Sequence, residues 1–358
     1  METEGTPAVL SNLAVPPGEL LQEELDAIGM TQQELARRTG RPAQAINEII
    51  HGRKRITHDT ALELEKVLGI PAYLWVRLEA DYELTAARLR DQEALREQEE
   101  WLKEFPVREM ERRRWMQPCK KRTDKVRELL KFLGVASFSA WQRRGLWCRI
   151  TPGAKVSEGA LAVWLRKGEL DGRETQTAPY DEARFRQALE KARELITQPP
   201  GVFVPHLKRL CAAAGVALVF TQELPRSGAS GSARWLTRET ALIQLSLRYK
   251  TNDHLWFSFF HEAAHVLRRQ VQRSYIDGVE EEGSAEEDAN QFARDLLIPP
   301  EAWGTFSRAG DFSRAGVERF AADVGIAAGI VVGRLQHEGL LPYHVLNDLK
   351  VKLEWSEE

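Results

Sequence analysis

Apolar residues in the first ninety positions recur with the spacing of short amphipathic helices. Thr31 and Glu34 have the spacing of a capping box, which predicts the start of a helix. Gly40 suits a tight turn after that helix, and a second helix is predicted over 42–50. The inward-facing positions of both helices are apolar: Leu35, Ala36, Ile46 and Ile49. Two helices joined by a glycine turn are typical of a helix-turn-helix.

The pattern changes after residue 90. Charges of both signs alternate densely over 91–131, which predicts a long exposed helix followed by a helical connector. Residues 124–195 are predicted to form several helices, with a loop over 168–179. Residues 216–220 form a short apolar strand, and apolar and polar residues alternate over 241–247, which predicts a half-buried strand. That second strand either holds an extended peptide by edge pairing or only packs the sheet.

An apolar run leads directly into His261-Glu262-Ala263-Ala264-His265. Residues i and i+4 of a helix share one face, so two imidazoles one turn apart can hold one zinc ion. Glu262 lies beside the metal rather than on it, where it can act as a general base toward water. In a buried helix these polar side chains need a partner, and a metal supplies one for all three. The alternative is the same buried helix without a metal.

A further helix is predicted over 284–299 and supplies a third ligand. Glu286 and Asn290 are four residues apart, so both can face the first helix. Glu286 then completes a His-His-Glu ligand set, and Asn290 orients a ligating imidazole. Because Glu286 lies in an acidic stretch, Glu287 and Asp288 compete with it for this role. Candidate donors to an oxyanion, which the sequence does not rank, are Tyr249, His254, Tyr275 and His344.

This part of the chain resembles the ImmA/IrrE family of zinc metallopeptidases. The resemblance is carried by three segments, 242–250, 256–265 and 286–299. It implies one zinc ion per chain on His261, His265 and Glu286, with Glu262 as the catalytic general base, as in a gluzincin. The family usually has glycine where this chain has Ala264. Family members cut helix-turn-helix repressors, so the implied substrate is a repressor or another regulatory protein.

The second helix of the predicted helix-turn-helix leaves Gln44 and Asn47 on its free face, and both side chain types pair with adenine in the major groove. Gln32, at the start of the first helix, is a further candidate contact. Four flanking cations suit phosphates: Arg41, Arg53, Lys54 and Arg55. The alternative is a helix pair that serves only packing, with 53–55 as a solvated loop.

Four segments of this region resemble XRE-class antitoxins of the HigA/VapI type: 30–36, 47–57, 59–69 and 73–79. The resemblance implies a domain that forms a homodimer and binds a palindromic operator in double-stranded DNA. Some members neutralise a toxin, so a cognate toxin is a further candidate partner.

Composition narrows the class of protein. The 358 residues are 43% hydrophobic and 29% charged, which is ordinary for a globular protein, and the net charge of −3 means that any basic surface is local. Cys119, Cys148 and Cys211 are far apart and odd in number, which indicates a reducing compartment. No stretch is apolar enough to span a bilayer, so we expect a cytoplasmic protein without a membrane partner, associated with the nucleoid when it binds DNA.

The sequence therefore predicts a mostly α-helical chain with a small β-sheet, in three parts. These are an all-α helix-turn-helix domain (1–90), a helical connector and subdomain (91–199), and an α+β, zincin-like metallopeptidase domain (200–358). The predicted function is a DNA-binding transcriptional regulator whose zinc endopeptidase cleaves a regulatory protein. The alternative is an antitoxin-like autorepressor of a toxin–antitoxin operon, whose zinc domain senses a signal or binds a partner without cleaving it.

Overall fold

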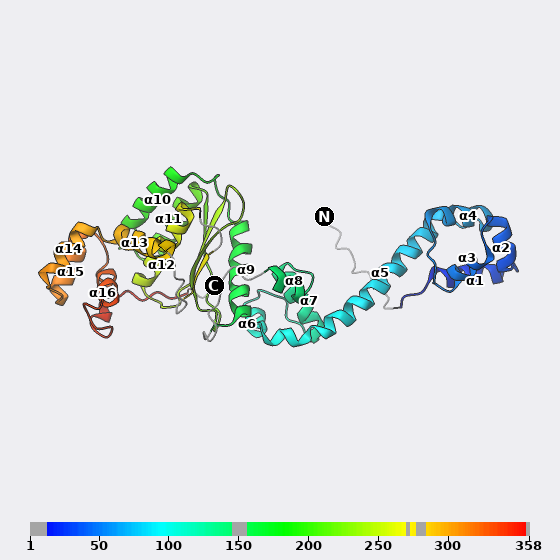
Figure 1. Cartoon of the computed structure of the whole chain (residues 1–358), viewed down its shortest axis with the longest axis horizontal. Coiled ribbons are helices and arrows are strands. Elements are labelled where there is room, and N and C mark those ends of the chain that lie inside the picture. Colours follow the sequence, from blue (N-terminus) through cyan, green and yellow to red (C-terminus); the bar gives the residue numbers. More distant parts are fainter. Residues whose placement is uncertain (1–12, 145–155, 270–272, 277–283, 356–358) are drawn as a thin grey trace. The chain divides into compact units, whose positions relative to one another are not determined.

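The computed structural model describes residues 13–144, 156–269, 273–276 and 284–355 (Figure 1). The chain divides into two compact units, Met1–Glu99 and Glu100–Glu358. Both units are rich in helix and the second also holds a small sheet, so the predicted fold class is confirmed. The first boundary falls after the one predicted at residue 90. The segment over 100–199 groups with the rest of the second unit rather than standing apart.

The described residues of the first unit form five helices: α1 (Pro17–Ala27), α2 (Gln32–Thr39), α3 (Ala43–Ile50), α4 (His58–Leu68) and α5 (Ala72–Glu97). The predicted cap is present, because the Thr31 hydroxyl accepts a hydrogen bond from the Glu34 backbone N–H at 3.1 Å. Gly40 ends α2 in the left-handed conformation, with φ +69°, which a glycine adopts without strain. Ile46 and Ile49 are buried against α1 and α2. The predicted helix-turn-helix is thus confirmed.

The described part of the second unit begins with six helices: α6 (Val107–Arg112), α7 (Arg122–Leu133), α8 (Phe138–Arg144), α9 (Glu158–Glu174), α10 (Glu182–Glu194) and α11 (Pro200–Ala213). A short 3-10 turn over Glu99–Lys103 precedes them. The predicted loop over 168–179 begins later than expected, since α9 continues to Glu174. A Cβ on Gly168 would lie 2.0 Å from the Gln244 carboxamide, so glycine lets this helix approach the sheet closely.

The sheet contains β1 (Val216–Phe220), β2 (Ala229–Trp235), β3 (Ala241–Leu245) and β4 (Arg273–Ile276), in the order β1-β3-β2-β4. β3 runs parallel to β1 and antiparallel to β2, and β2 runs antiparallel to β4. α9 covers one face of the sheet, and α11 and α12 (Asn252–Leu267) cover the other (Figure 1).

For the strand over 241–247 the expectation of half-burial was wrong, and of its two alternative roles the structure agrees with sheet packing. All five residues of β3 are buried, because helices cover both faces of the sheet. The polar Gln244 is satisfied there, since its amide donates to the Trp164 carbonyl at 2.7 Å. β3 also pairs with a strand on each side, so it has no free edge for a peptide.

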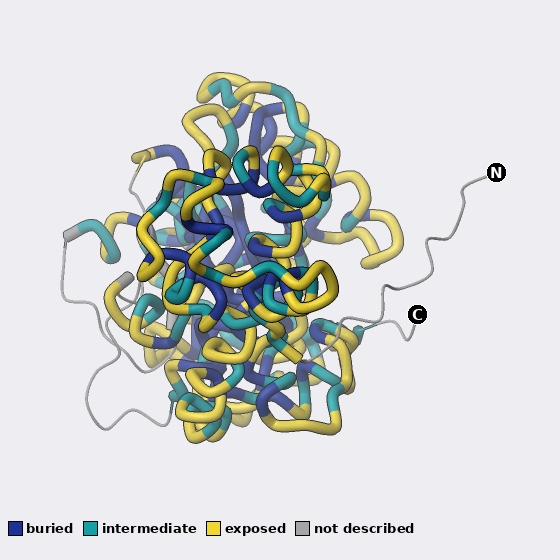
Figure 2. Tube along the Cα trace, turned by 90° about the vertical axis from the view of Figure 1, so that its right-hand side faces the viewer, coloured by how far each residue is buried: buried dark blue, intermediate teal, exposed yellow. Residues whose placement is uncertain are grey.

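The remaining helices are α13 (Ser284–Leu297), α14 (Pro300–Ala309), α15 (Arg314–Val324), α16 (Ala328–His337) and the 3-10 turn Asn347–Leu349. The chain then returns to the start of α12. The Asn252 backbone N–H donates to the Val351 carbonyl at 2.9 Å, and Lys350 lies 2.7 Å from the Asp253 carboxylate. In Figure 2 the buried residues, in dark blue, follow the inner sides of these helices and the strands. Among the described helices, none is both long and apolar enough to cross a membrane.

Candidate metal centre and helix-turn-helix surface

The motif His261–His265 lies in the C-terminal half of α12, a helix that packs against β2, β3 and α13. The apolar residues of α12 fill the main core, and the polar residues of the motif are buried with them. His261 is 1% exposed, Glu262 0% and His265 2%. Polar side chains at this depth must be satisfied within the fold or by a bound group.

Three side chains converge at one point between α12 and α13. The Nε2 atoms of His261 and His265 are 3.1 Å apart. The two carboxylate oxygens of Glu286 lie 3.3 Å from Nε2 of His261 and 3.4 Å from Nε2 of His265. Helical spacing brings the two histidines to one face, and the close packing of α13 on α12 adds the carboxylate.

This triangle has the size that zinc requires. In a tetrahedral site with metal–ligand bonds of roughly 2.0–2.1 Å, neighbouring ligand atoms are roughly 3.3–3.4 Å apart. The donor set, two imidazoles and one carboxylate, is also one that zinc prefers. Among the described residues, His261, His265 and Glu286 are the group whose spacing allows them to share one metal ion.

The electrostatics agree with this arrangement. Burial raises the pKa of Glu286, but hydrogen bonds from His261 and His265 outweigh it, so the pKa lies well below its usual range. The carboxyl is therefore ionised near neutral pH. The competing acids are engaged elsewhere, since Glu287 pairs with Arg294 and Asp288 with Arg268.

Asn290 orients one of the imidazoles. Its Oδ1 lies 2.9 Å from Nδ1 of His261. In the neutral ring, a proton on Nδ1 that is donated to this oxygen leaves the lone pair of Nε2 facing His265 and Glu286. This contact suits the tautomer that a metal ligand would require, in place of the one in which Nε2 donates to Glu286.

Glu262 is buried against β2, where the chain has a glycine. A Cβ on Gly231 would lie 2.5 Å from Oε1 and 2.8 Å from Cγ of Glu262, so any larger residue would displace the carboxyl. Sequence reasoning missed Gly231 and the whole of β2. The available signal was a run of small residues over 227–233.

The candidate oxyanion donors fall in different places. Tyr249 and His254 stack with ring centroids 4.2 Å apart and line a pocket at the start of α12. His344 is exposed in the segment after α16. The side chain of Tyr275 lies outside the described residues.

The free face of α3 carries a polar network. Gln44 is exposed and donates to Glu48 at 3.0 Å. Asn47 donates to Gln32 at 3.3 Å and accepts from Arg53 at 3.2 Å. Three of the predicted DNA contacts therefore hold one another in position on one surface.

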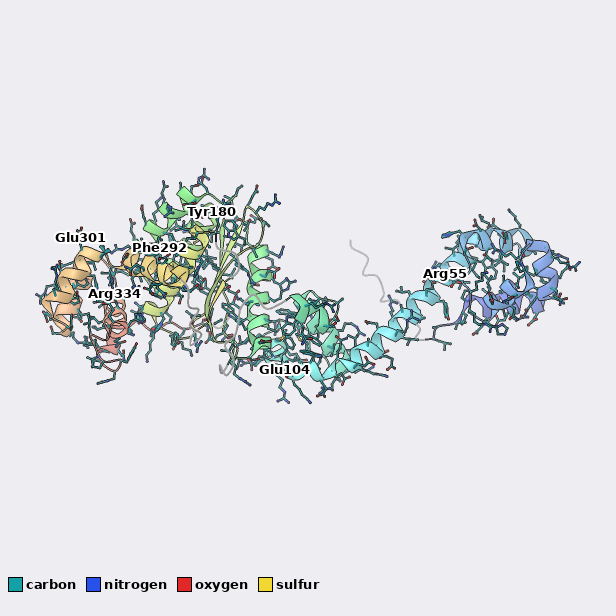
Figure 3. The ribbon with its side chains drawn as sticks, viewed as in Figure 1. Arg55, Glu104, Tyr180, Phe292, Glu301 and Arg334 are labelled. Carbon is teal, nitrogen blue, oxygen red and sulfur yellow. The ribbon has the colours of Figure 1, made fainter. Side chains whose placement is uncertain are left out.

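The flanking cations differ in their surroundings. Arg41 is half-buried in an ion pair with Glu63. Arg55, labelled in Figure 3, lies 3.5 Å from Glu83 with both side chains exposed, which leaves a weak pair. Lys54 is exposed. Lys54, Arg53 and Arg55 can therefore reach a phosphate more readily than Arg41.

A helix-turn-helix family profile matches residues 21–75. Virulence-associated protein I of Dichelobacter nodosus is 37% identical over 75 residues, which is 21% of this chain and 69% of that protein. The chain belongs to the helix-turn-helix family. Its first unit is the helix-turn-helix domain, with α2 and α3 as the helix pair.

Solved structures similar to the helix-turn-helix domain include an addiction module antidote protein of the HigA family from Coxiella burnetii. It is 30% identical, covers 24% of this chain and 92% of its own, and has a TM-score of 0.22. The antitoxin HigA of Pseudomonas aeruginosa, solved with the higBA promoter, is 26% identical. The match covers 23% of this chain and 90% of that protein's chain, and its TM-score is also 0.22.

Proposed function

We propose that this chain is a DNA-binding transcriptional regulator whose second unit is a zinc metallopeptidase that cleaves a repressor or another regulatory protein. The observation that carries the peptidase is the convergence of His261, His265 and Glu286 within 3.4 Å, next to the buried carboxyl of Glu262. A complete ligand set beside a carboxyl that is not a ligand is the arrangement of a hydrolytic zinc site rather than a structural one.

Zinc bound at this site supplies Lewis acidity, which makes water a usable nucleophile near neutral pH. Glu262 takes the proton from the attacking water and passes it to the nitrogen of the leaving amine. Its burial against Gly231 keeps the carboxyl in one place for both transfers. Asn290 keeps the His261 ring in the ligating tautomer throughout.

The helix-turn-helix domain directs this activity to transcription. In the proposed complex, Gln44 and Asn47 enter the major groove of an operator, and Lys54 contacts the backbone. A homodimer would read two half-sites of a palindrome. Membership of the helix-turn-helix family and the polar network on α3 support this half of the proposal.

The second candidate is an antitoxin-like autorepressor whose metal centre senses zinc or binds a partner without cleavage. The family profile favours it in one respect, since the match covers residues 21–75 and does not reach the metal site. In this reading Glu262 has no chemical task, although its position beside the ligands is the same.

One experiment distinguishes the two candidate functions. It compares zinc-loaded full-length protein with its Glu262→Gln variant. Each is incubated with repressors and small toxin-like proteins encoded next to it, and products are identified by intact-mass spectrometry. We expect wild-type protein to cut one of them, or its own chain, and Glu262→Gln to lose about 10²–10⁴-fold in rate while keeping its zinc. Equal cleavage by both proteins would overturn the proposed mechanism. A zinc-loaded protein that cuts nothing but binds its operator would favour the second candidate.

A further inference from the structure

A pocket of about 340 Å³ lies beside the metal centre in the second unit. Phe257, one turn before His261 on α12, lines it, and the two rings are 6.1 Å apart. Asn290, which holds His261, lines it from α13, and Ser230 lines it from β2 next to the glycine that touches Glu262. Each element that builds the metal centre thus also forms a wall of the pocket. The pocket therefore shares its walls with the metal centre, although His261, His265 and Glu286 do not line it.

The inner wall of the pocket is apolar. Leu297 at the end of α13, Ile298 directly after it and Ile330 on α16 are at most 4% exposed, and Phe257 adds an aromatic face. A side chain buried here would exchange water for aliphatic and aromatic carbon, which favours large uncharged groups. The volume falls at the lower end of the range of small-molecule sites, so it has room for a large side chain.

The charged residues of the wall already have partners. Arg294 binds Glu287 and Gln291, Arg334 binds Glu338 at 2.8 Å, and Lys350 binds Asp253 at 2.7 Å. A charged side chain that entered would lose its hydration without gaining a dedicated counter-ion. These pairs therefore favour an uncharged side chain over an acidic or basic one. Arg334, labelled in Figure 3, projects from α16 and lies 4.2 Å from the Trp303 ring.

We propose that this pocket binds a large uncharged side chain, aliphatic or aromatic, of the residue that flanks the cleaved bond. The inference rests on the proposed peptidase function and specifies its substrate class: a segment with a leucine, methionine or phenylalanine type of residue at the cut. Burial of such a side chain should improve affinity by about tenfold to a hundredfold over glycine.

The test uses amino-acid hydroxamates, which share one metal-binding group and differ in side chain. Glycine, leucine, phenylalanine, aspartate and lysine hydroxamates are titrated into zinc-loaded full-length protein by calorimetry. We expect the leucine and phenylalanine compounds to bind at least tenfold tighter than the other three. If all five hydroxamates bind a zinc-loaded protein equally, the proposed role of the pocket is wrong, whereas the metal site is supported. A protein that holds no zinc would overturn the proposed function itself.

A pair of matched variants locates the preference. Ser258 lines the pocket and is 8% exposed, so Ser258→Leu should fill it. Ser307→Leu makes the same change on α14, at a serine outside the pocket lining. In Ser258→Leu we expect the leucine and phenylalanine hydroxamates to bind only as tightly as glycine hydroxamate, while the zinc content is unchanged. In Ser307→Leu we expect these two hydroxamates to keep their tighter binding. A preference that survives in Ser258→Leu would contradict the assignment. If Ser258→Leu does not fold, Ile330→Phe fills the same pocket from α16 and decides the question by the same criteria.

Discussion

The two units of this chain place their functional polar residues in opposite environments. In the helix-turn-helix domain, Gln44 and Lys54 are exposed. In the second unit, His261, Glu262 and His265 are at most 2% exposed. An exposed polar side chain is hydrated until its partner arrives, so substitution changes binding more than stability. A buried one must be satisfied inside the fold, so its substitution changes both. Function is therefore separable from folding in the first unit and coupled to it in the second.

The largest expected effect comes from removing a metal ligand. His265→Ala should reduce zinc from one ion per chain to a trace, because two remaining ligands hold the ion poorly. It should also destabilise the second unit toward urea, since zinc at a thousandfold excess over its dissociation constant contributes about 4 kcal/mol. Elemental analysis and urea unfolding measure the two effects. A chelator should reproduce the loss in the wild-type protein, and His344→Ala, an exposed histidine, should change neither.

A smaller effect is expected from Gly231→Ala, which places a methyl group against Glu262. Overpacking at a buried site costs about 1–3 kcal/mol of stability. The displaced carboxyl should slow cleavage by about a hundredfold, while zinc content stays the same. Gly304→Ala is the matched control, because a Cβ there meets nothing within 4 Å, and it should be neutral or slightly stabilising. Equal stability of the two variants would show that β2 does not hold Glu262 in place.

The contrast also explains what the sequence could predict. The metal cluster was predictable because its residues lie at helical spacings, with His261 and His265 on α12 and Glu286 and Asn290 on α13. The contact of Gly231 with Glu262 was not predictable, because Gly231 lies on a strand far from Glu262 in the sequence. No periodic pattern within either segment indicates such a contact. The helix-turn-helix was predictable because caps, a turn glycine and packing all lie within one short segment.

The wrong predictions share one cause, which is burial of residues that usually face solvent. Gln244 alternates with apolar residues and indicated an exposed face of β3, yet α9 covers that face and accepts the amide hydrogen bond. Gly168 indicated a loop, yet it is the residue that permits this approach of α9. The same helix packs on both α7 and the sheet, so it links the predicted connector to the rest of the second unit.

In the helix-turn-helix domain we expect substitutions to change DNA binding and to leave the stability of the fold unchanged. Gln44→Ala should weaken operator binding by about 1–3 kcal/mol and relax the preference at one base pair. Lys54→Ala should weaken binding on all sequences and lower the slope of log affinity against log salt by about one. Fluorescence anisotropy at several salt concentrations measures both. The free energy of unfolding of both variants should lie within about 0.5 kcal/mol of the wild-type value. A larger loss would show that function and folding are coupled in the first unit as well.

The smallest effect concerns a buried polar atom outside the metal centre. Burial raises the pKa of Tyr180 to about 12, and the charge of Glu182 adds to the shift. An unfolded tyrosine ionises near about pH 10, so the folded state keeps its proton longer. The contribution of Tyr180 is therefore complete below pH 10 and is lost as the pH rises through about 12.

Tyr180→Phe tests this point by urea unfolding between pH 9 and 12. The Tyr180 hydroxyl has no hydrogen-bond partner among the described residues, so its removal should cost little at pH 7. We expect the variant to lose less stability than wild type above pH 10. Parallel curves for the two proteins would show that this hydroxyl is solvated in solution.

The central claim is that His261, His265 and Glu286 hold one zinc ion, and X-ray absorption at the zinc edge on purified full-length protein tests it most directly. The account predicts one zinc per chain with two imidazoles and oxygen ligands, at distances of about 2.0–2.2 Å, and no sulfur. A shell at about 2.3 Å, the length of a bond to cysteine sulfur, or protein that contains no zinc after metal loading, would contradict it.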